Sequence, residues 1–465
     1  MTTMDQPTED AQRISARVFW ILFLLIALLG GAMRVADSAA WRSTGFDEIL
    51  YRRYVNMMDG GEQVAPVFQR GDRGAQPYKM VIEGRGAGAM PEMVRFFLET
   101  QKSATTECEL PPTRFLYLYT SWLWKRAQFG GTKALTMREI NIPGEGDSYA
   151  KDADHVDPAL ASLHRVACLF TMLAMLGGGL AAWRMAGHWA GLGALALMAF
   201  DPVQIHFSQH ALIDGVFLLW AVLCVWTTWE CLRNPASWGW LAAHTVCLAL
   251  MVLTKENAFF VYCALGAVVL VNRWLHFGKV TPRFLLLSIA GPLLALIALV
   301  VMAGGPTAFV EVYRTLVAKA QNLAYAQKTG DGPWHRYLLD VMTVSPVVLC
   351  LALGALFAVA PRRKDIAFLA VFVAASYLLM CNVKYGINLR YASIWALPFR
   401  AAAFAMLWQM CARFGQRQGL VVCVLVAGLC AYELRQYTIL AMNPERPLYE
   451  LVPNDLLRLL DILKP

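Results

Sequence analysis

The chain has 465 residues, of which 58% are hydrophobic and only 16% are charged, and its mean hydropathy is +0.46. Soluble domains are about one quarter charged, so this composition excludes a disordered or coiled-coil protein and disfavours a soluble multidomain enzyme. Apolar runs of about twenty residues recur from residue 162 almost to the end, which is typical of an all-α polytopic membrane protein.

The first predicted span covers roughly residues 18–35 and follows Arg13 and Arg17. A signal peptide has a similar pattern, but the many later spans favour a retained anchor. The apolar pattern predicts about eleven transmembrane helices in all. The later spans are at roughly residues 162–183, 187–201, 211–231, 238–253, 257–272, 284–303, 338–360, 365–382, 391–413 and 417–436.

The formal net charge is +8, and many of the basic residues lie in short loops between the predicted spans. One set of loops is rich in Lys and Arg, including the run 362–364, and this set marks the cytoplasmic face. The basic charge therefore indicates how the chain is oriented in the membrane, and it does not indicate a nucleic-acid partner. The predicted division is a cytoplasmic tail at 1–17, a large external loop at 36–160, a helix bundle at 161–303, a second external loop at 304–337, C-terminal helices at 338–436 and an external tail at 437–465.

Within the first external loop, Asp47 and Glu48 follow the first span, and Tyr51 and Tyr54 follow at helical spacing. Two carboxylates at the membrane interface would suit a general base for a hydroxyl nucleophile. Alternatively, Asp47 caps an interfacial helix and Glu48 lies in its first turn.

The segment 113–129 is rich in Tyr and Trp and opens after two prolines with Arg114. Counting it as a span would place the basic loops outside, so an external interfacial helix fits better. Arg114 would contact a lipid phosphate or simply an anionic headgroup.

Three further external loops carry ionisable residues, which are costly near hydrocarbon and often mark substrate paths. His206, His210 and Asp214 are each four residues apart and would share a helix face, either as a hydrogen-bond network or as metal ligands. Lys255 lies in a tight turn and either binds an anion or extends to the interface.

The last loop contains Lys384, Arg390 and Tyr391, and paired cations there suit a phosphate. Binding to anionic lipid is the alternative. Tyr337, with Trp334 before it, adds aromatic side chains at the same face as part of an aromatic belt or a sugar-binding surface.

These residues occur in an order that resembles the GT-C glycosyltransferases of the protein mannosyltransferase and lipid A aminoarabinose transferase type. The resemblance covers roughly residues 18–410 and depends on Asp-Glu after the first span, Pro111-Pro112, Asp201-Pro202, Thr254-Lys255 and Arg390-Tyr391. One departure is Leu110, where some relatives have a lysine before the proline, and another is the long first external loop.

The resemblance implies a GT-C fold and transfer, with inversion, of a monosaccharide from a polyprenyl phosphate donor. It gives Asp47 the role of base and makes Asp214 a second acidic residue, with Lys255 and Arg390 holding the donor phosphate. Arg114 and Lys384 would assist the phosphate, and Tyr51, His210, Tyr337 and Tyr391 would line the sugar or acceptor cavity. No cofactor is implied, and a divalent metal is compatible but not indicated.

The acceptor is expected to be a lipid, a polysaccharide or a protein on the external side. Because the chain is compact and shows no retention signal, we expect a bacterial cytoplasmic membrane with a periplasmic active site. Two alternatives remain open, a lipid-linked glycan ligase or polymerase, and a non-enzymatic transporter or flippase, which would need charges near the membrane midplane.

Overall fold

The computed structural model is almost entirely helical, as the apolar pattern predicts. The structure describes residues 14–36, 46–64, 80–103, 110–130, 157–320, 330, 332–383 and 387–442. Residues 1–13 and 443–465 of the two predicted tails, and Lys384, lie outside this part of the chain.

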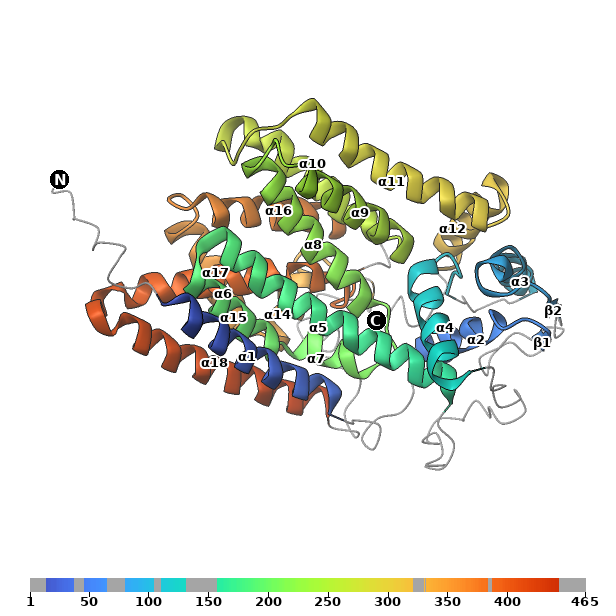
Figure 1. The fold of residues 1–465 in the computed structure, drawn as a ribbon, viewed down its shortest axis with the longest axis horizontal. Helices are drawn as coiled ribbons and strands as arrows, with labels where there is room; N and C mark the ends of the chain where they lie inside the picture. Colours follow the sequence, from blue (N-terminus) through green and yellow to red (C-terminus); the bar gives the residue numbers. More distant parts are fainter. Residues whose placement is uncertain are drawn as a thin grey trace.

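The N-terminal third combines one apolar helix with several smaller elements, which gather at one end of the molecule (Figure 1). The short strands pair antiparallel, with Gln63 opposite Val81. The elements are α1 (Ala16–Val35), α2 (Phe46–Met57), β1 (Glu62–Val64), β2 (Met80–Ile82), the 3-10 helix η3 (Gly86–Ala89), α3 (Met90–Ser103) and α4 (Phe115–Phe129).

The remaining elements form the helix bundle, in which α5 contacts both α6 and α8, and α8 contacts α9. They are α5 (Pro158–Ala186), α6 (His188–Ala199), α7 (Pro202–Gln209), α8 (Asp214–Arg233), α9 (Trp238–Thr254), α10 (Ala258–Leu275), α11 (Pro282–Met302), α12 (Pro306–Ala320), α14 (Arg336–Val344), α15 (Pro346–Ala358), α16 (Lys364–Met380), η5 (Tyr391–Trp395), α17 (Ala396–Met410), η6 (Cys411–Arg417) and α18 (Gln418–Ala441).

Capping residues fix where several of these helices begin. Asp157 accepts hydrogen bonds from the backbone of α5 at Ala159 and Leu160, and Asp201 does the same for α7 at Val203. Each cap precedes a proline, whose fixed φ and missing N–H suit the first helical position. The Asp201-Pro202 pair therefore starts a new helix, and α6 and α7 are bent by 56° at this break.

The lengths and hydropathies agree with a membrane protein. Among the described residues, six helices are long and apolar enough to cross a membrane, or seven if the bent pair α6–α7 counts as one span. Most predicted spans correspond to one helix, but the span predicted at 338–360 is divided between α14 and α15. Several helices, such as α15, are also short, so the predicted number of crossings is not confirmed. The segment predicted as an interfacial helix is α4, and it is not among the candidate spans.

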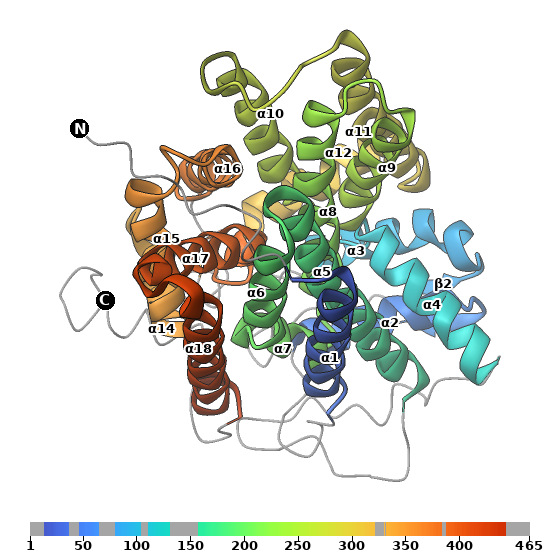
Figure 2. The ribbon, with the colours of Figure 1, turned by 60° about the vertical axis from the view of Figure 1, so that its left-hand side comes forward.

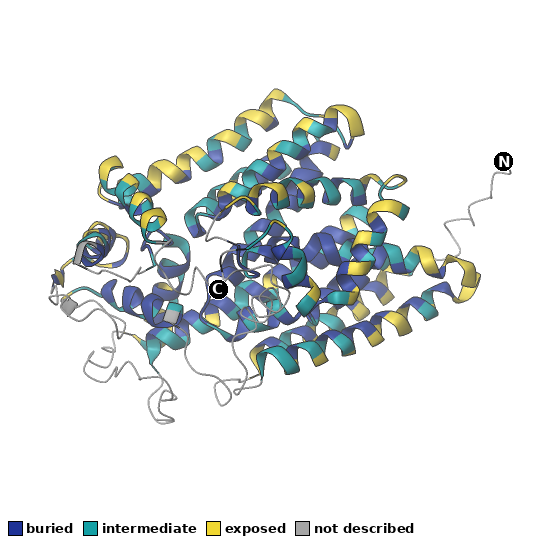
Figure 3. Ribbon diagram, turned by 180° about the vertical axis from the view of Figure 1, so that it is seen from behind, coloured by how far each residue is buried: buried dark blue, intermediate teal, exposed yellow. Residues whose placement is uncertain are grey.

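The pattern of burial also agrees with a membrane protein. Buried residues fill the centre of the bundle and exposed ones follow its outer helices (Figure 3). On α11, the apolar residues Leu286, Leu294 and Val301 are largely exposed. A continuous apolar surface of this kind is stable against lipid and would be unfavourable in water. The chain is an integral membrane protein.

The bundle also contains a buried polar group at the junction of α7, α15, α17 and α18, which we call the core ion cluster. Arg400 lies 2.9 Å from Asp201 and 3.8 Å from Glu433. Ser345 donates a hydrogen bond of 2.6 Å to Glu433. All four side chains are buried, so their charges are compensated only by one another and by neighbouring polar groups.

Candidate active site

Residues from five separate parts of the chain meet in what we call the site cluster. The helices α2 and α4, which supply two of them, lie together at one end of the bundle (Figures 1 and 2). The cluster consists of Asp47 in the first turn of α2, Arg114 before α4, Asp214 at the start of α8, Lys255 and Glu256 between α9 and α10, and Arg390 before η5.

Arg390 connects two carboxylates at the centre of this cluster. Its Nη1 atom lies 2.8 Å from Oδ2 of Asp47 and 3.9 Å from Oδ2 of Asp214. Asp214 is also bound by Lys255, at 2.6 Å. The side chain of Asp214 is 3% exposed and that of Asp47 is 24% exposed. Asp214 is therefore enclosed by cations, whereas Asp47 reaches accessible space.

Arg114 forms a second ion pair beside the first. Its guanidinium binds both carboxylate oxygens of Glu256, at 2.5 and 3.3 Å, and donates to the hydroxyl of Tyr51 at 2.5 Å. Burial alone would lower the pKa of Arg114, but Glu256 outweighs this effect and holds the pKa well above its ordinary value. Burial would conversely raise the pKa of Glu256, and Arg114 keeps it below its ordinary value. Both groups are charged at neutral pH.

Lys255 is the most enclosed cation of the cluster. Its Nζ atom lies 4.5 Å from the ring centroid of Tyr391, a distance at which a cation and an aromatic face attract. Burial lowers the pKa of Lys255 below its ordinary value, although Asp214 opposes the shift. The enclosure explains why a single carboxylate contact does not restore the ordinary pKa.

The formal charges of the site cluster balance. Three carboxylates face three cations, so an anionic phosphate that enters must bind cations that already have carboxylate partners. The pairs are Asp47 with Arg390, Asp214 with Lys255, and Glu256 with Arg114.

Glu48 occupies a different environment from its neighbour Asp47. It is 2% exposed, accepts a hydrogen bond of 2.6 Å from the backbone of Ala211, and lies 2.9 Å from His164 and 3.5 Å from His210. Burial alone would raise the pKa of Glu48, but the histidine contacts hold it well below its ordinary value. Glu48 thus attaches α2 to α5 and to the segment after α7, which leaves Asp47 directed at Arg390.

The prediction of a shared helix face for His206, His210 and Asp214 is wrong. The helix α7 ends at Gln209, and α8 begins only at Asp214. The rings of His206 and His210 lie 4.1 Å apart, but Asp214 is bound to Lys255 instead. In the described parts of the chain, no group of three or more His, Cys, Asp or Glu residues could hold a metal ion.

Comparisons with known proteins concern the sequence and the fold of this chain. Residues 153–303 match the dolichyl-phosphate-mannose-protein mannosyltransferase family, and no curated protein matches the sequence. The structure resembles that of ArnT from Cupriavidus metallidurans bound to undecaprenyl phosphate, with a TM-score of 0.51 and 14% identity over 95% of this chain and 77% of that one. The structure therefore has the GT-C fold of these membrane proteins, and about a third of the chain matches a family of membrane glycosyltransferases.

The oligosaccharyltransferase from Archaeoglobus fulgidus has the same GT-C fold. In its apo form it matches with a TM-score of 0.57 and 11% identity over 93% of this chain. This chain spans only 57% of the length of that protein. The family match at 153–303 runs from the start of α5 to the end of α11 and therefore includes Asp214 and Lys255, but not Asp47 or Arg390.

Two residues that the sequence predicts for the sugar or acceptor cavity differ in accessibility. Tyr391 is partly buried against Lys255, as a site residue should be. Tyr337 is 1% exposed, and its ring packs 5.3 Å from that of Trp395. Tyr337 therefore belongs to the hydrophobic core, and it supports the segment on which Arg390 and Tyr391 lie.

Two residues of the site, Glu256 and His164, were not predicted from the sequence. Glu256 binds Arg114, and the only sequence signal was its position next to Lys255. His164 binds Glu48, and nothing in the sequence around it distinguishes it from other residues at the start of a span. Both contacts join segments more than 100 residues apart, so only the fold reveals them.

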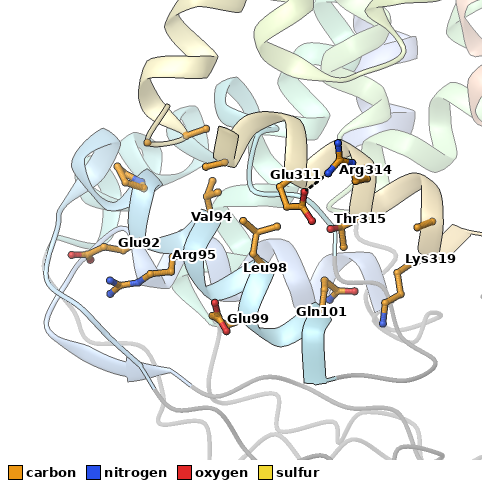
Figure 4. A pocket seen from close by; sticks show the side chains of 15 residues that line it. Glu92, Val94, Arg95, Leu98, Glu99, Gln101, Glu311, Arg314, Thr315 and Lys319 are labelled. Atoms are coloured by element: carbon orange, nitrogen blue, oxygen red, sulfur yellow. Dashed lines mark hydrogen bonds and ion pairs between the residues drawn. The ribbon is translucent and has the colours of Figure 1, made fainter. Parts of the chain in front are cut away.

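A cavity of about 650 Å³ lies between α3 and α12. Figure 4 shows Arg95 and Leu98 of α3 on one side of it, and Glu311 bound to Arg314 of α12 on the other. Two glycines with positive φ, Gly304 and Gly305, make the turn that brings α12 into this position. None of the residues that line this cavity belongs to the site cluster.

The helix α12 also reaches the site from its other side. The hydroxyls of Tyr313 and Thr113 lie 3.3 Å apart. Because Thr113 precedes Arg114, this contact joins the second predicted external loop to the arm of the cluster formed by Arg114 and Glu256.

Proposed function

We propose that this chain transfers a monosaccharide from a polyprenyl phosphate lipid to an acceptor on the external face of a membrane, with inversion at the sugar C1 atom. The observation that carries the proposal is the site cluster, which holds an accessible carboxylate, Asp47, within contact of a cation, Arg390. A base next to phosphate-binding cations suits displacement of a phosphate leaving group.

The reaction balances without a further reactant. An acceptor oxygen attacks C1 of the sugar, and its proton passes to the carboxylate of Asp47. The bond between C1 and the phosphate oxygen breaks, and its electron pair remains on the lipid phosphate. Arg390, Arg114 and Lys255 would stabilise this charge, because fixed cations in a partly dry site need little reorganisation.

The other residues of the site have supporting roles in this proposal. Asp214 keeps Lys255 and Arg390 in place, since it contacts both. Glu48 positions the first turn of α2 and does not take part in proton transfer, because its oxygens are bound by His164, His210 and a backbone N–H. Tyr51 holds Arg114. The proposal needs no metal or other cofactor.

The membrane arrangement follows from the same chemistry. The lipid tail would remain among the apolar helices while the sugar and phosphate reach the site cluster at the end of the bundle. We place this end on the periplasmic side of a bacterial cytoplasmic membrane, with the N-terminus in the cytoplasm, from the distribution of basic loops. The acceptor would be a lipid, a polysaccharide or a protein.

A donor assay tests the proposal. Purified protein in lipid is incubated with a panel of labelled polyprenyl phosphate monosaccharides, and loss of the sugar from the lipid is followed. We expect turnover by the wild-type protein and a loss of about 10²–10⁴-fold for Asp47→Asn, the usual contribution of a general base. Glu311→Gln, which removes a remote exposed carboxylate, serves as the control and should turn over normally.

The two alternative functions, a glycan ligase and a transporter, predict different results in the same assay. A glycan ligase would consume only lipid-linked oligosaccharides, so a second panel of these donors is included. A transporter would leave every sugar on its lipid. Normal turnover by a folded Asp47→Asn protein would eliminate Asp47 as the base.

A further inference from the structure

Arg390 is bound by a carboxylate where the proposed function needs it to bind phosphate. The Asp47–Arg390 contact of 2.8 Å is a charge-assisted hydrogen bond, and it occupies a guanidinium nitrogen. The same contact directs Oδ2 of Asp47 at the guanidinium and not at an acceptor. Both residues are therefore engaged with each other before any substrate arrives.

The two carboxylates that flank Arg390 are not equivalent. Asp214 lies farther from Arg390, at 3.9 Å, and has its own cation in Lys255 at 2.6 Å. Asp47 has the shorter contact and the more accessible side chain. An incoming anion can therefore replace Asp47 at Arg390 without disturbing the enclosed pair formed by Asp214 and Lys255.

We propose that the Asp47–Arg390 ion pair is a resting lock that the donor phosphate opens by exchange, which releases Asp47 as the base only when the donor is bound. This inference depends on the proposed function of the site. Two anions compete for one guanidinium, so Asp47 weakens donor binding in proportion to the strength of its own contact. The lock also keeps the base from activating water or an acceptor in the empty site.

The position of Asp47 on α2 makes such an exchange practicable. Glu48 is fixed by His164, His210 and the backbone of Ala211, so the helix itself need not move. Only the side chain of Asp47 has to change rotamer, and the accessible space around it permits this. Arg390 is held from behind by the bond from its backbone N–H to the side chain of Asn388, at 2.9 Å.

Binding of undecaprenyl phosphate tests the lock, because this lipid carries the phosphate without a sugar to transfer. Its dissociation constant is measured in detergent for wild type, Asp47→Asn and Asp47→Ala, and each protein is checked by size-exclusion chromatography. We expect both variants to bind about three- to tenfold more tightly, the range for loss of one competing, partly exposed carboxylate. Asp47→Glu, which retains the charge, and Glu311→Gln should bind like wild type.

Further arms separate lipid phosphate from phosphate in general. Inorganic phosphate should compete weakly and phosphatidylglycerol should not bind at the same affinity, because neither has the polyprenyl chain. If wild type binds undecaprenyl phosphate but the two Asp47 variants bind equally or more weakly, the lock is wrong while the proposed function stands. If wild type binds no polyprenyl phosphate at all, both proposals fail.

Discussion

The site cluster and the core ion cluster contain similar residues in different surroundings. Each places an arginine between two acidic side chains, at 2.8 and 3.9 Å for Arg390 and at 2.9 and 3.8 Å for Arg400. In the site cluster, Asp47 and Glu256 remain about a quarter exposed, at 24% and 25%. In the core ion cluster, every charged side chain is buried.

This difference separates a structural ion network from the one that we propose to be catalytic. A fully buried network is compensated internally and joins helices, here α7, α17 and α18 through Asp201, Arg400 and Glu433. A network with an accessible carboxylate can exchange partners with a ligand. Charged residues within apolar segments are therefore insufficient evidence of a substrate path, and their accessibility has to be known.

The strongest test of the comparison replaces the two arginines in turn. Arg400→Met should destabilise the protein by about 3–5 kcal/mol, because it leaves two buried carboxylates without their cation. Arg390→Met should leave folding close to normal, because Asp47 is accessible and Asp214 keeps Lys255, but should abolish sugar transfer. Thermal unfolding in detergent and the donor assay distinguish the two results.

Arg400→Lys is the matched control, since it keeps the charge and should recover part of the stability. The assigned roles of the two arginines would be contradicted if Arg400→Met folded normally and lost activity, or if Arg390→Met failed to fold. Either result would mean that burial does not separate the two networks.

The second test concerns the carboxylate that positions α2. Glu48→Gln should lower the stability of the protein by about 1.5–3 kcal/mol near neutral pH, the cost of losing charged hydrogen bonds. Since the pKa of Glu48 in the folded protein lies well below its ordinary value of 4.5, its stabilising effect is present above that value and is lost as pH falls through the folded pKa. The unfolding midpoint of Glu48→Gln should therefore lie below that of the wild-type protein at neutral pH and down to about pH 5.

Below that range the two midpoints should approach each other as Glu48 takes up a proton. A gap that grows on acidification would contradict the assigned direction of the pKa shift. Equal midpoints at pH 7 would remove Glu48 from the positioning role.

The smallest effect is expected at the second ion pair of the site. Arg114→Lys keeps the charge but loses the two-pronged contact with Glu256, so the donor KM should rise about three- to tenfold with a smaller change in kcat. Arg95→Lys, an exposed arginine beside the cavity between α3 and α12, is the control. A change confined to kcat would instead assign Arg114 to the transition state, and no change in either constant would remove it from the phosphate site.

The sequence was informative about the membrane helices and about single residues of the site. Apolar runs located the helices because each span must bury its own backbone polar groups. The sequence singled out Asp47, Arg114, Asp214, Lys255 and Arg390 because an ionisable residue near hydrocarbon is unusual, and the structure brings them together.

Other features depended on contacts that no local pattern encodes. Four-residue spacing suggested one helix face for His206, His210 and Asp214, but the chain leaves the helix at Gln209 and separates them. Tyr337 lies in an aromatic segment of a predicted external loop, but its ring packs in the core.

The sequence by itself determined that this protein is a helical membrane protein and which loops carry its unusual charges, because hydropathy and charge are properties of short segments. Only the tertiary structure decided which charges neutralise one another. Asp47 and Arg390 are separated by 343 residues in the sequence, and their pairing depends on how α2, α8 and η5 meet. The same folding decided that Asp47 stays accessible while Glu48, one residue later, is buried.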